Sequence, residues 1–513
     1  MVKFPIWYTV SFVTAAAILL DGQRGMAQEN QYTSRPVRMG AGRTVLSTRA
    51  NPLANRSTPA PASTSLGGHP RPKYFGFQAL VAIATSDERS FTDIDYEHNL
   101  HNGYVGDPLI TAGDEDFVVG LIDTGASFDF ASGSHADMLG LSGSMLTENT
   151  VPVSGVGGQV MFVPITQPMG YFAGGLSAVN PDGSLNPSAV VGHSNVSLVA
   201  LDPIICAGSE FPIAVMGTAF ISFFDTIIRV DTPRTVTAAG GTITGPDVQL
   251  GTNLAAPFTI VHSVSIDFGA LFPALTASYY PDFSDPDFRV PFLPTQLSFS
   301  ALDFPLGGNY YDTLTVEHGD SGPQSVRVLV DTGAQSSIIT PGLVADLSLP
   351  FEPDFFAQVC GIDGLVSDVP GYYIDYVRIA AQGGALEFSR APFVVLDIAA
   401  PDGGAMGGIL GMNFFWNRNV RMRLSLDGSS FLDLSGPIPV AYGDSDVDFD
   451  VDGEDYAFLA DCTSVEGLPP ECDHLDVDGN GVVGLMEYGR FQLCHSGAGA
   501  TAHPDCAALA AGL

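Results

Sequence analysis

Short apolar stretches of strand character, separated by turns, fill most of this 513-residue chain. Between about residue 73 and residue 434, runs rich in Val, Ile, Thr and Phe alternate with clusters of Gly, Pro and Asp, whereas sustained helical periodicity is scarce. Short apolar runs bounded by turn residues are typical of β-strands. The pattern therefore predicts that the main body of the protein is all-β.

The main body contains an internal repeat with an offset of 208 residues, in which LIDTGA (residues 121–126) matches LVDTGA (residues 329–334). Two further pairs of segments follow in the same order: VSGVGG (153–158) with VCGIDG (359–364), and VMGTAF (215–220) with ILGMNF (409–414). Features that recur in one order indicate a duplicated structural unit. We therefore predict two similar lobes.

In each copy an apolar strand ends on Asp-Thr-Gly, first at Asp123, Thr124 and Gly125 and then at Asp331, Thr332 and Gly333. The strand fixes the position of the carboxylate, the glycine allows a tight turn, and apolar surroundings limit hydration of the charge. If the two loops face each other, Asp123 and Asp331 share one proton and titrate in two separate steps. One carboxylate then acts as a base on water while the other donates a proton, so both are candidate catalytic residues.

This order of features resembles that of the aspartic proteases, both the two-lobed pepsin-like enzymes and the retroviral-type dimers. The resemblance covers roughly residues 73–434. It implies two acid-protease β-barrel lobes, hydrolysis of peptide bonds, no cofactor for catalysis, and cross-bracing of the two loops by Thr124 and Thr332. The alternative is a pair of Asp-Thr-Gly turns that are similar in shape but catalytically inert.

Ala126 and Ala334 follow the two Asp-Thr-Gly sequences, as in retroviral-type enzymes, whereas pepsin-like enzymes usually have Ser or Thr there. Loss of a hydrogen bond to the ionised carboxylate raises its pKa. We therefore predict activity closer to neutral pH than in a pepsin.

Two glycine-rich tips are expected to fold over the cleft as hinged flaps that exclude water. Their glycines are Gly155, Gly157 and Gly158 in the first lobe, and Gly361 and Gly364 in the second. The alternative is an ordinary hairpin turn at each position.

From Asp444 onward the chain is rich in Asp, and a second repeat appears with an offset of 32 residues. Oxygen-bearing residues recur at the spacing of a calcium loop. The predicted ligands are Asp444, Asp446, Asp448, Asp450 and Asp455 in the first loop, and Asp476, Asp478, Asn480, Val482 and Glu487 in the second. The repeats resemble EF-hand and dockerin-type repeats, which implies a small α-helical module that binds Ca²⁺ and has a possible cohesin-like or cell-surface partner.

The first loop departs from this pattern, because Phe449 stands where the sharp turn favours Gly. A rival register that starts at Asp448 ends on Leu459, which cannot bind a metal. Two alternatives remain open for the tail: it folds around calcium without docking to a partner, or it is an acidic linker.

Of the six cysteines, Cys462, Cys472, Cys494 and Cys506 lie near the C-terminus. An even number of clustered cysteines in an exported chain indicates disulfides. Their spacing favours the local pairs Cys462–Cys472 and Cys494–Cys506. The pairing of Cys206 and Cys360 stays open.

The N-terminus has an early Lys, a short apolar run and a small residue at Ala27. These features predict a secretory signal peptide over residues 1–27, the alternative being a membrane anchor. No later segment has transmembrane character. The expected order is signal peptide (1–27), flexible leader (28–72), N-terminal lobe (73–231), interlobe connection with strands (232–304), C-terminal lobe (305–438) and calcium module (439–513).

The chain has 56 acidic and 20 basic residues, a formal net charge of −36. A surface of this sign repels nucleic acids and anionic membranes, which excludes them as expected partners. The ten histidines form no zinc-binding motif. The sequence thus favours a secreted or cell-surface aspartic endopeptidase that cleaves proteins or peptides and has a calcium-binding tail. The alternative is a non-catalytic protease-like protein that binds a surface or scaffold through that tail.

Overall fold

The mostly β architecture expected from the hydrophobic pattern is confirmed. The computed structural model describes residues 49–50, 69–86, 116–154, 160–167, 169–186, 189–206, 209–210, 213–238, 241–251, 253–269, 308–362, 364–398, 406–424, 430–445, 450–463, 468, 472, 474–497, 502–503 and 505–506. The predicted signal peptide and most of the predicted leader lie outside these residues. Within them, no helix is both long enough and apolar enough to cross a membrane.

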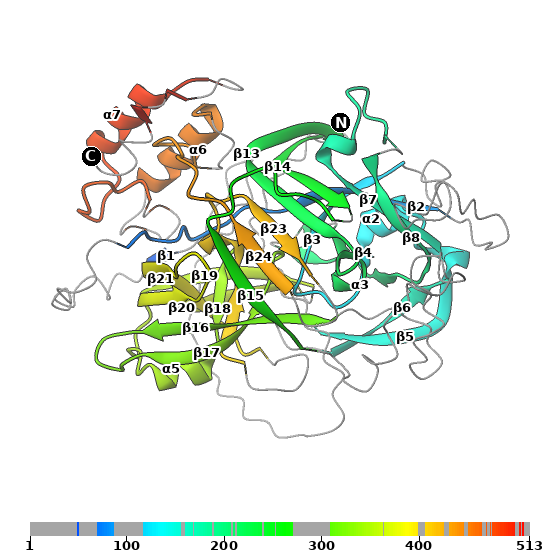
Figure 1. The fold of residues 1–513 in the computed structure, drawn as a ribbon, viewed down its shortest axis with the longest axis horizontal. Coiled ribbons are helices and arrows are strands. Elements are labelled where there is room, and N and C mark those ends of the chain that lie inside the picture. The colour runs from blue at the N-terminus through cyan, green and yellow to red at the C-terminus, as the bar shows by residue number, and fades with distance from the viewer. Residues whose placement is uncertain are drawn as a thin grey trace.

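The N-terminal lobe is built on a nine-stranded sheet with the order β5-β6-β9-β4-β12-β3-β2-β7-β8 (Figure 1). The strands are β2 (Leu80–Ser86), β3 (Val118–Ile122), β4 (Phe130–Ser132), β5 (Leu146–Ser154), β6 (Val160–Thr166), β7 (Met169–Gly175), β8 (Val191–Val196), β9 (Val199–Leu201) and β12 (Ala214–Met216). The short helices are α2 (Gly133–Met138), η3 (Gly143–Met145), η4 (Leu176–Ala178) and α3 (Thr218–Ile221). A separate two-stranded ladder joins β10 (Ile205–Cys206) to β11 (Ser209–Glu210).

The C-terminal lobe belongs to a 13-stranded sheet with the order β1-β19-β20-β21-β18-β22-β17-β16-β15-β24-β23-β13-β14. Its own strands are β16 (Asn309–Glu317), β17 (Gln324–Val330), β18 (Ser337–Ile339), β19 (Phe355–Gly361), β20 (Gly364–Ile379), β21 (Leu386–Val395), β22 (Gly408–Leu410), β23 (Val420–Arg423) and β24 (Ser430–Leu434). The helices are α5 (Pro341–Asp346) and η7 (Met412–Phe414), and β1 (Arg49–Ala50) pairs with β19.

The same strand pairings occur in both lobes around the Asp-Thr-Gly sequences. β3 lies parallel to β12 and antiparallel to β2, and β17 lies parallel to β22 and antiparallel to β16. Because β3 and β17 each lie between two neighbours, their last residues are buried on both faces, which explains their continuous apolar sequence. One apolar cluster contains Ile122 and Val330, so it joins the two carboxylate-bearing strands.

The connection between the lobes contributes strands to the sheet shared with the C-terminal lobe. β13 (Asp225–Ala238) pairs with β14 (Gly241–Gly251) and β23, and β15 (His262–Gly269) pairs with β24 and β16. In Figure 1 these strands lie across the middle of the molecule, between the lobes. β13 continues through residue 232, the expected start of the connection between the lobes.

Two helices, α6 (Gly453–Thr463) and α7 (Leu485–Cys494), form the tail at the upper left of Figure 1. They have an apolar cluster of their own, in which Leu459 of α6 and Phe491 of α7 are buried. The rings of Tyr456 and Tyr488 meet edge to face with centroids 6.2 Å apart. The tail therefore packs as a separate unit.

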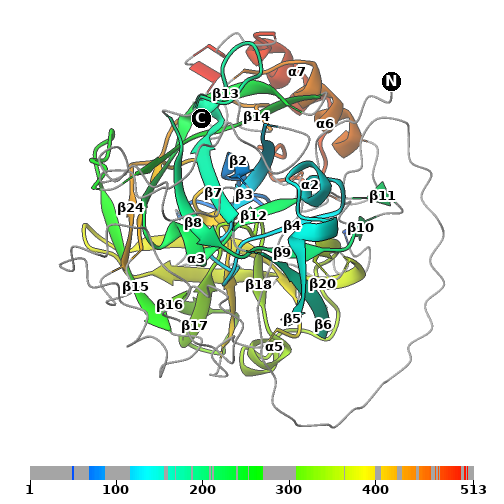
Figure 2. The same ribbon diagram turned by 90° about the vertical axis from the view of Figure 1, so that its right-hand side faces the viewer.

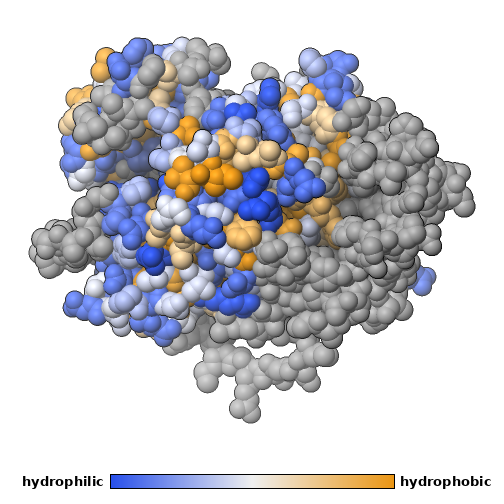
Figure 3. All heavy atoms as spheres, in the orientation of Figure 1, coloured by the Kyte–Doolittle hydropathy of each residue, from blue (hydrophilic) through white to orange (hydrophobic). Residues whose placement is uncertain are grey.

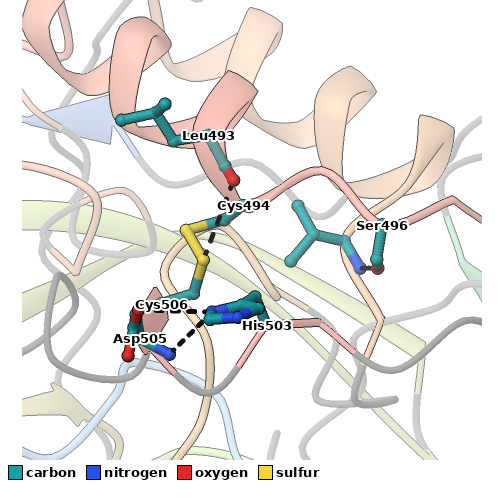
Figure 4. The surroundings of a disulfide bond; sticks show 7 residues. Leu493, Cys494, Ser496, His503, Asp505 and Cys506 are labelled. Carbon is teal, nitrogen blue, oxygen red and sulfur yellow. Dashed lines mark hydrogen bonds and ion pairs between the residues drawn. A yellow bond between two sulfur atoms is a disulfide. The ribbon is translucent and has the colours of Figure 1, made fainter.

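Two short disulfides hold the tail together, with the local pairing expected from the spacing. Cys462 is bonded to Cys472 and Cys494 to Cys506, across sequence separations of 10 and 12 residues. Figure 4 shows the second bridge at the C-terminal end of α7, beside His503. Such bridges compensate for the small core that a unit of this size can build.

Lys73 connects the tail to the main body. Its Nζ atom lies 3.4 Å from the carbonyl oxygens of both Asp444 and Ser445 and 4.5 Å from the ring centroid of Trp416. Its own carbonyl accepts a hydrogen bond from Asn413 Nδ2 at 3.2 Å. The ammonium group thus lies between the body and the start of the first predicted calcium loop.

Candidate active site

The two Asp-Thr-Gly sequences leave β3 and β17 in the same way. The backbone N–H of Asp123 donates to Met216 O, and that of Asp331 donates to Leu410 O, both at 3.0 Å. The parallel partner strand of each lobe therefore fixes the point at which the carboxylate-bearing loop begins. Both aspartates are 0% exposed.

Thr124 and Thr332 brace the two loops against each other, in the arrangement that the resemblance implies. Each hydroxyl accepts a hydrogen bond from the backbone N–H of the other threonine, at 3.1 and 3.0 Å. Each hydroxyl also donates to the opposite strand, Thr124 to Val330 O at 2.7 Å and Thr332 to Ile122 O at 2.9 Å. Because all these groups are buried, the four bonds fix one relative position of the lobes.

Each glycine of the two motifs lies directly against the carboxyl group of the opposite lobe. A β-carbon added to Gly125 would lie 2.6 Å from Asp331 Cγ, and one added to Gly333 would lie 2.5 Å from Asp123 Cγ. Neither glycine has a positive φ angle. The glycines are therefore needed for this close approach and not for the conformation of the turn, which was the reason expected from the sequence.

The two carboxylates accept equivalent backbone hydrogen bonds. Asp123 Oδ1 accepts from the N–H groups of Gly125 and Ala126 at 2.7 and 3.0 Å. Asp331 Oδ1 accepts from Gly333 and Ala334 at 2.8 and 3.1 Å. Each carboxylate therefore directs its Oδ1 atom to its own loop.

Burial raises the pKa of Asp331 well above its usual value, and the neighbouring charge of Asp123 and a hydrogen bond with it raise the pKa further. The N–H groups of Gly333 and Ala334 act in the opposite direction but do not cancel these effects. Asp331 Oδ2 is buried and has no protein donor. This environment favours one proton on the pair, as expected for two carboxyl groups in contact.

A third buried carboxylate, Asp129, lies behind the first loop and was not identified from the sequence. Its Oδ1 atom accepts the N–H of Gly217 at 2.8 Å, and burial raises its pKa well above the usual range. At the repeat-related position, Ser337 Oγ accepts the N–H of Gly411 at 2.9 Å. The offset of 208 residues aligns Asp129 with Ser337, so a comparison of polar positions between the repeats could have found both.

Each loop also contacts the segment that leads into the opposite lobe. Asn309, the first residue of β16, donates from Nδ2 to Ser127 Oγ at 3.0 Å. In the other lobe, Ser336 Oγ donates to Tyr74 O at 2.8 Å, and the N–H of Gly76 donates to Gln335 O at 2.8 Å. These crossed contacts reinforce the bracing by the two threonines.

The structure describes the second of the two predicted flaps but not the glycines of the first. Gly155, Gly157 and Gly158 of the first flap lie outside the described residues. In the second, Gly361 pairs with Gly364 at the end of the hairpin formed by β19 and β20. The second hairpin is bonded covalently to the N-terminal lobe by the Cys206–Cys360 disulfide, which spans 154 residues of sequence and which the sequence left open.

The second predicted calcium loop brings three of its carboxylates together. Oxygen atoms of Asp476, Asp478 and Glu487 lie within 4.8 Å of one another. Asp476 accepts the N–H groups of Asn480 and Gly481 at 3.1 and 2.7 Å, so the loop is closed on its first residue. The φ of Gly481 is 81°, the left-handed conformation that favours glycine at the sharp turn.

The first loop contains a cluster of its own, formed by Asp450, Asp452 and Asp455. Asp452 was not among the predicted ligands, although its place, three residues before the terminal carboxylate of the loop, corresponds to a position that often contributes to such sites. Predicted ligands Asp446 and Asp448 lie outside the described residues.

Two lobes that each bring one buried aspartate to a braced common centre define a paired-carboxylate site. Residues 314–414, which contain Asp331 and the second hairpin, match the family described as aspartyl protease. This part of the C-terminal lobe is accordingly similar to the aspartyl proteases.

Two solved structures are also similar to this chain. One is an aspartic proteinase from Irpex lacteus, with 9% identity, a TM-score of 0.30, and coverage of 71% of this chain and 97% of the proteinase. The other is Basic 7S globulin from soybean, with 9% identity, a TM-score of 0.31, and coverage of 70% and 96%. No curated protein matches the chain.

Proposed function

We propose that this protein is a secreted aspartic endopeptidase whose catalytic residues are Asp123 and Asp331. The observation that carries the proposal is the direct contact of each carboxyl group with the opposite Asp-Thr-Gly loop, because it places two ionisable groups close enough to share a proton. The family match of residues 314–414 supports the reaction class. The three disulfides are compatible with secretion.

In the proposed reaction, Asp331 holds the shared proton because its pKa is raised, and Asp123 is the base. Asp123 takes a proton from a water molecule as its oxygen attacks the carbonyl carbon of the peptide bond, while Asp331 donates its proton to the carbonyl oxygen. The tetrahedral intermediate then breaks at the C–N bond: the proton on Asp123 passes to the leaving nitrogen, and one of the two hydroxyl groups of the intermediate returns its proton to Asp331 as the carboxylic acid forms. Proton transfers of this kind need no metal or cofactor.

Replacement of either aspartate tests the proposal directly. Asp123→Asn and Asp331→Asn should each reduce hydrolysis of an unfolded protein by between about 10² and 10⁴-fold, because neither variant can exchange the shared proton. Asp346→Asn, at an exposed position of α5, is the matched control and should retain full activity. Equal activity in all three variants would contradict the assignment and favour the inert, surface-binding alternative.

We also propose that the tail binds Ca²⁺, most strongly through its second loop. Glu487 is 1% exposed; its Oε2 atom accepts the N–H of Gly484 at 2.9 Å, whereas its buried Oε1 atom has no partner. A buried carboxylate oxygen without a donor is costly unless a cation neutralises it. Together with Asp476, Asp478, Asn480 and the carbonyl of Val482, it makes the set of hard oxygen ligands that Ca²⁺ favours. Bound Ca²⁺ would contribute positive charge and rigidity to the tail.

We propose a cohesin-like or cell-surface protein as the docking partner of the tail. Leu485 is 90% exposed, Leu493 74% and Met486 49%, all on α7. Figure 3 shows hydrophobic residues on the outer edge of the tail, at the upper left. Leu485→Asp with Leu493→Asp should release the protein from the producing cell surface into the medium. Unchanged retention would argue for a tail that only folds around its metal.

A further inference from the structure

A short segment at the start of the main body, residues 73–76, lies against the second Asp-Thr-Gly loop. Tyr74 O accepts a hydrogen bond from the hydroxyl of Ser336 at 2.8 Å. The N–H of Gly76 donates to Gln335 O at 2.8 Å, and Gln335 Nε2 donates to Gly76 O at 3.1 Å. The segment therefore supports the residues that directly follow the second motif.

The backbone of Lys73 belongs to a buried hydrogen-bond network beside the same loop. Its carbonyl accepts from Asn413 Nδ2 at 3.2 Å, and Asn413 Oδ1 accepts from Ser337 Oγ at 2.7 Å. Ser337 Oγ in turn accepts the N–H of Gly411 at 2.9 Å. Asn413 and Ser337 are both 0% exposed. A displacement of Lys73 is therefore transmitted to the loop that begins at Asp331.

The side chain of Lys73 leaves this network and reaches the tail. Its Nζ atom lies 3.4 Å from the carbonyl oxygens of both Asp444 and Ser445. Figure 2 shows α6 and α7 at the top of the molecule, outside the two large sheets. Among the described residues, the apolar cluster of the tail contains none from the body, so the two parts share no hydrophobic core. Coupling between them therefore depends on polar contacts such as this one.

Ser445 connects the Lys73 contact to the carboxylates of the first predicted calcium loop. The N–H of Ser445 donates to Asp455 Oδ1 at 2.7 Å, and the N–H of Asp452 donates to Asp455 Oδ2 at 2.9 Å. Oxygen atoms of Asp450, Asp452 and Asp455 lie within 4.8 Å of one another. Like charges at this separation repel, and a bound cation would remove the repulsion and fix Asp455. It would thereby also fix Ser445, whose carbonyl Lys73 binds.

We propose that Lys73 is a positioning residue for Asp331, through which the calcium-binding tail fixes the second catalytic loop and controls hydrolysis. The inference rests on the proposed function of both parts, and it adds a regulator: Ca²⁺ bound in the tail, away from the carboxyl pair. Loss of calcium loosens Ser445 and its contact with Lys73, and the loop then samples positions in which Asp331 is displaced relative to Asp123. Such control is a coupling free energy between two separate sites.

Hydrogen exchange of the full chain in saturating calcium tests the link without any need for catalysis. Lys73→Met removes the ammonium group, and the amides of residues 333–337 should then exchange about tenfold faster than in the wild type. Lys73→Arg retains a cation beside Trp416 and donors for the two carbonyls, so it should restore protection. Arg378→Met removes a surface cation, 3.7 Å from Glu387, and is the matched control that should leave the loop protected. Equal protection in Lys73→Met and the wild type would overturn the proposal.

Chelation of calcium is the second arm of this experiment. In the wild type it should accelerate the amides of residues 333–337 about tenfold and leave those of β7, in the other lobe, unchanged. In Lys73→Met the same treatment should add less than about twofold, because the link is already broken. If chelation accelerates the loop equally in both proteins, or accelerates β7 as much as the loop, the tail does not act through Lys73 and the proposal is wrong.

Kinetics separates positioning of the loop from a general effect on folding. With a quenched-fluorescent peptide and saturating calcium, kcat of Lys73→Met should fall about tenfold while KM changes little, as expected when only transition-state stabilisation is lost. Lys73→Arg and Arg378→Met should both keep the wild-type kcat. A lower melting temperature of Lys73→Met with an unchanged kcat would reduce Lys73 to a structural residue and overturn its positioning role.

Failure of this inference is distinguishable from failure of the proposed function. If no peptide is hydrolysed but exchange of the loop depends on Lys73 and on calcium, the link between tail and loop stands, while the endopeptidase and its control are wrong. If hydrolysis depends on Asp123 and Asp331 but neither Lys73→Met nor chelation changes exchange or kcat, the control by the tail is wrong and the endopeptidase stands.

Discussion

Thr124 and Thr332 bind each other across the boundary between the lobes, each through its hydroxyl group and the backbone N–H of the other. The residues next to them in sequence are the two candidate catalytic aspartates. The same bonds that join the lobes therefore set the separation of the carboxyl groups. Stability and the proposed catalysis should therefore be coupled at this point of the fold.

We expect Thr332→Val to lower both stability and activity. The change leaves the buried Thr124 N–H and Ile122 carbonyl without their partner, at a cost of about 1–3 kcal/mol for each group. Urea denaturation followed by tryptophan fluorescence measures the loss. Thr313→Val, at an exposed position of β16, is the control and should stay near the wild-type value. A loss of equal size in both variants would show that the bracing bonds contribute little.

Addition of a hydroxyl group beside the Asp123–Asp331 pair should shift the pH–rate profile to lower pH. The raised pKa of Asp331 keeps its proton to higher pH, so the basic limb of the pH–rate profile should lie closer to neutrality than in a pepsin. Ala334→Ser provides a donor to the ionised carboxylate, which lowers the pKa of the pair and moves that limb down by about one pH unit.

The profile of kcat/KM between pH 3 and pH 8 is the measurement, and Ala345→Ser at an exposed position of α5 is the control. A basic limb confined to strongly acid conditions in the wild type, or a limb that Ala334→Ser leaves in place, would contradict the role given to this alanine.

The sequence predicted the carboxylate pair because its signals are local and repeated. An apolar strand, Asp-Thr-Gly and an apolar-apolar-Gly element need only neighbouring residues, and their recurrence at one offset identified Asp123 and Asp331 together. The sequence explained Gly125 and Gly333 by a tight turn. In the structure each is needed because the carboxyl group of the opposite lobe lies against it, a contact that depends on how two distant segments meet.

Features that depend on tertiary contacts between distant residues were beyond a single sequence. Cys206 and Cys360 carry no spacing signal, since 154 residues separate them, whereas the tail cysteines pair across 10 and 12 residues. The burial of Asp129 likewise follows from the packing of the loop onto Gly217 and not from its neighbours in sequence.

Stability should fall as the pH rises from about 4 to about 6, and Asp312 is one cause. It is 7% exposed; burial raises its pKa to about 6, and Asp267 raises it further, against a hydrogen bond from the Thr313 N–H. A raised pKa means that the folded state holds a proton which the unfolded state has already lost. The contribution of Asp312 to the free energy of unfolding is therefore greatest below the ordinary pKa of Asp. It falls by about 3 kcal/mol as the pH rises through the pKa that Asp312 has in the folded state.

Asp312→Asn should remove this part of the slope, so that its unfolding free energy varies less between pH 4 and pH 7 than that of the wild type. Asp320→Asn, at an exposed turn, is the control and should keep the wild-type slope. Equal slopes in all three proteins, measured by urea denaturation at each pH, would show that Asp312 is not held in its protonated form.

Removal of calcium should destabilise the tail through its second loop. Any ligand that binds only the folded state stabilises it by an amount set by its concentration relative to Kd, about 2.7 kcal/mol at a hundredfold excess. Chelation should therefore lower the melting temperature of the tail. Glu487→Gln should lower the melting temperature of the tail in the presence of calcium, because the amide has one oxygen in place of two and no charge. Chelation should then change the melting temperature of this variant very little.

Asp461→Asn, an exposed acidic position on α6, separates the loss of a ligand from a general change in charge, and it should retain the wild-type response to chelation. Isothermal titration with Ca²⁺ gives the affinity independently of the melt. Because the Oε1 atom of Glu487 is buried without a donor, the Gln variant also removes a desolvated charge and should melt at or above the temperature of the chelated wild type. If the chelated wild type melts at the same temperature as the calcium-loaded protein, the proposal that the tail binds Ca²⁺ through the buried Oε1 atom of Glu487 is wrong.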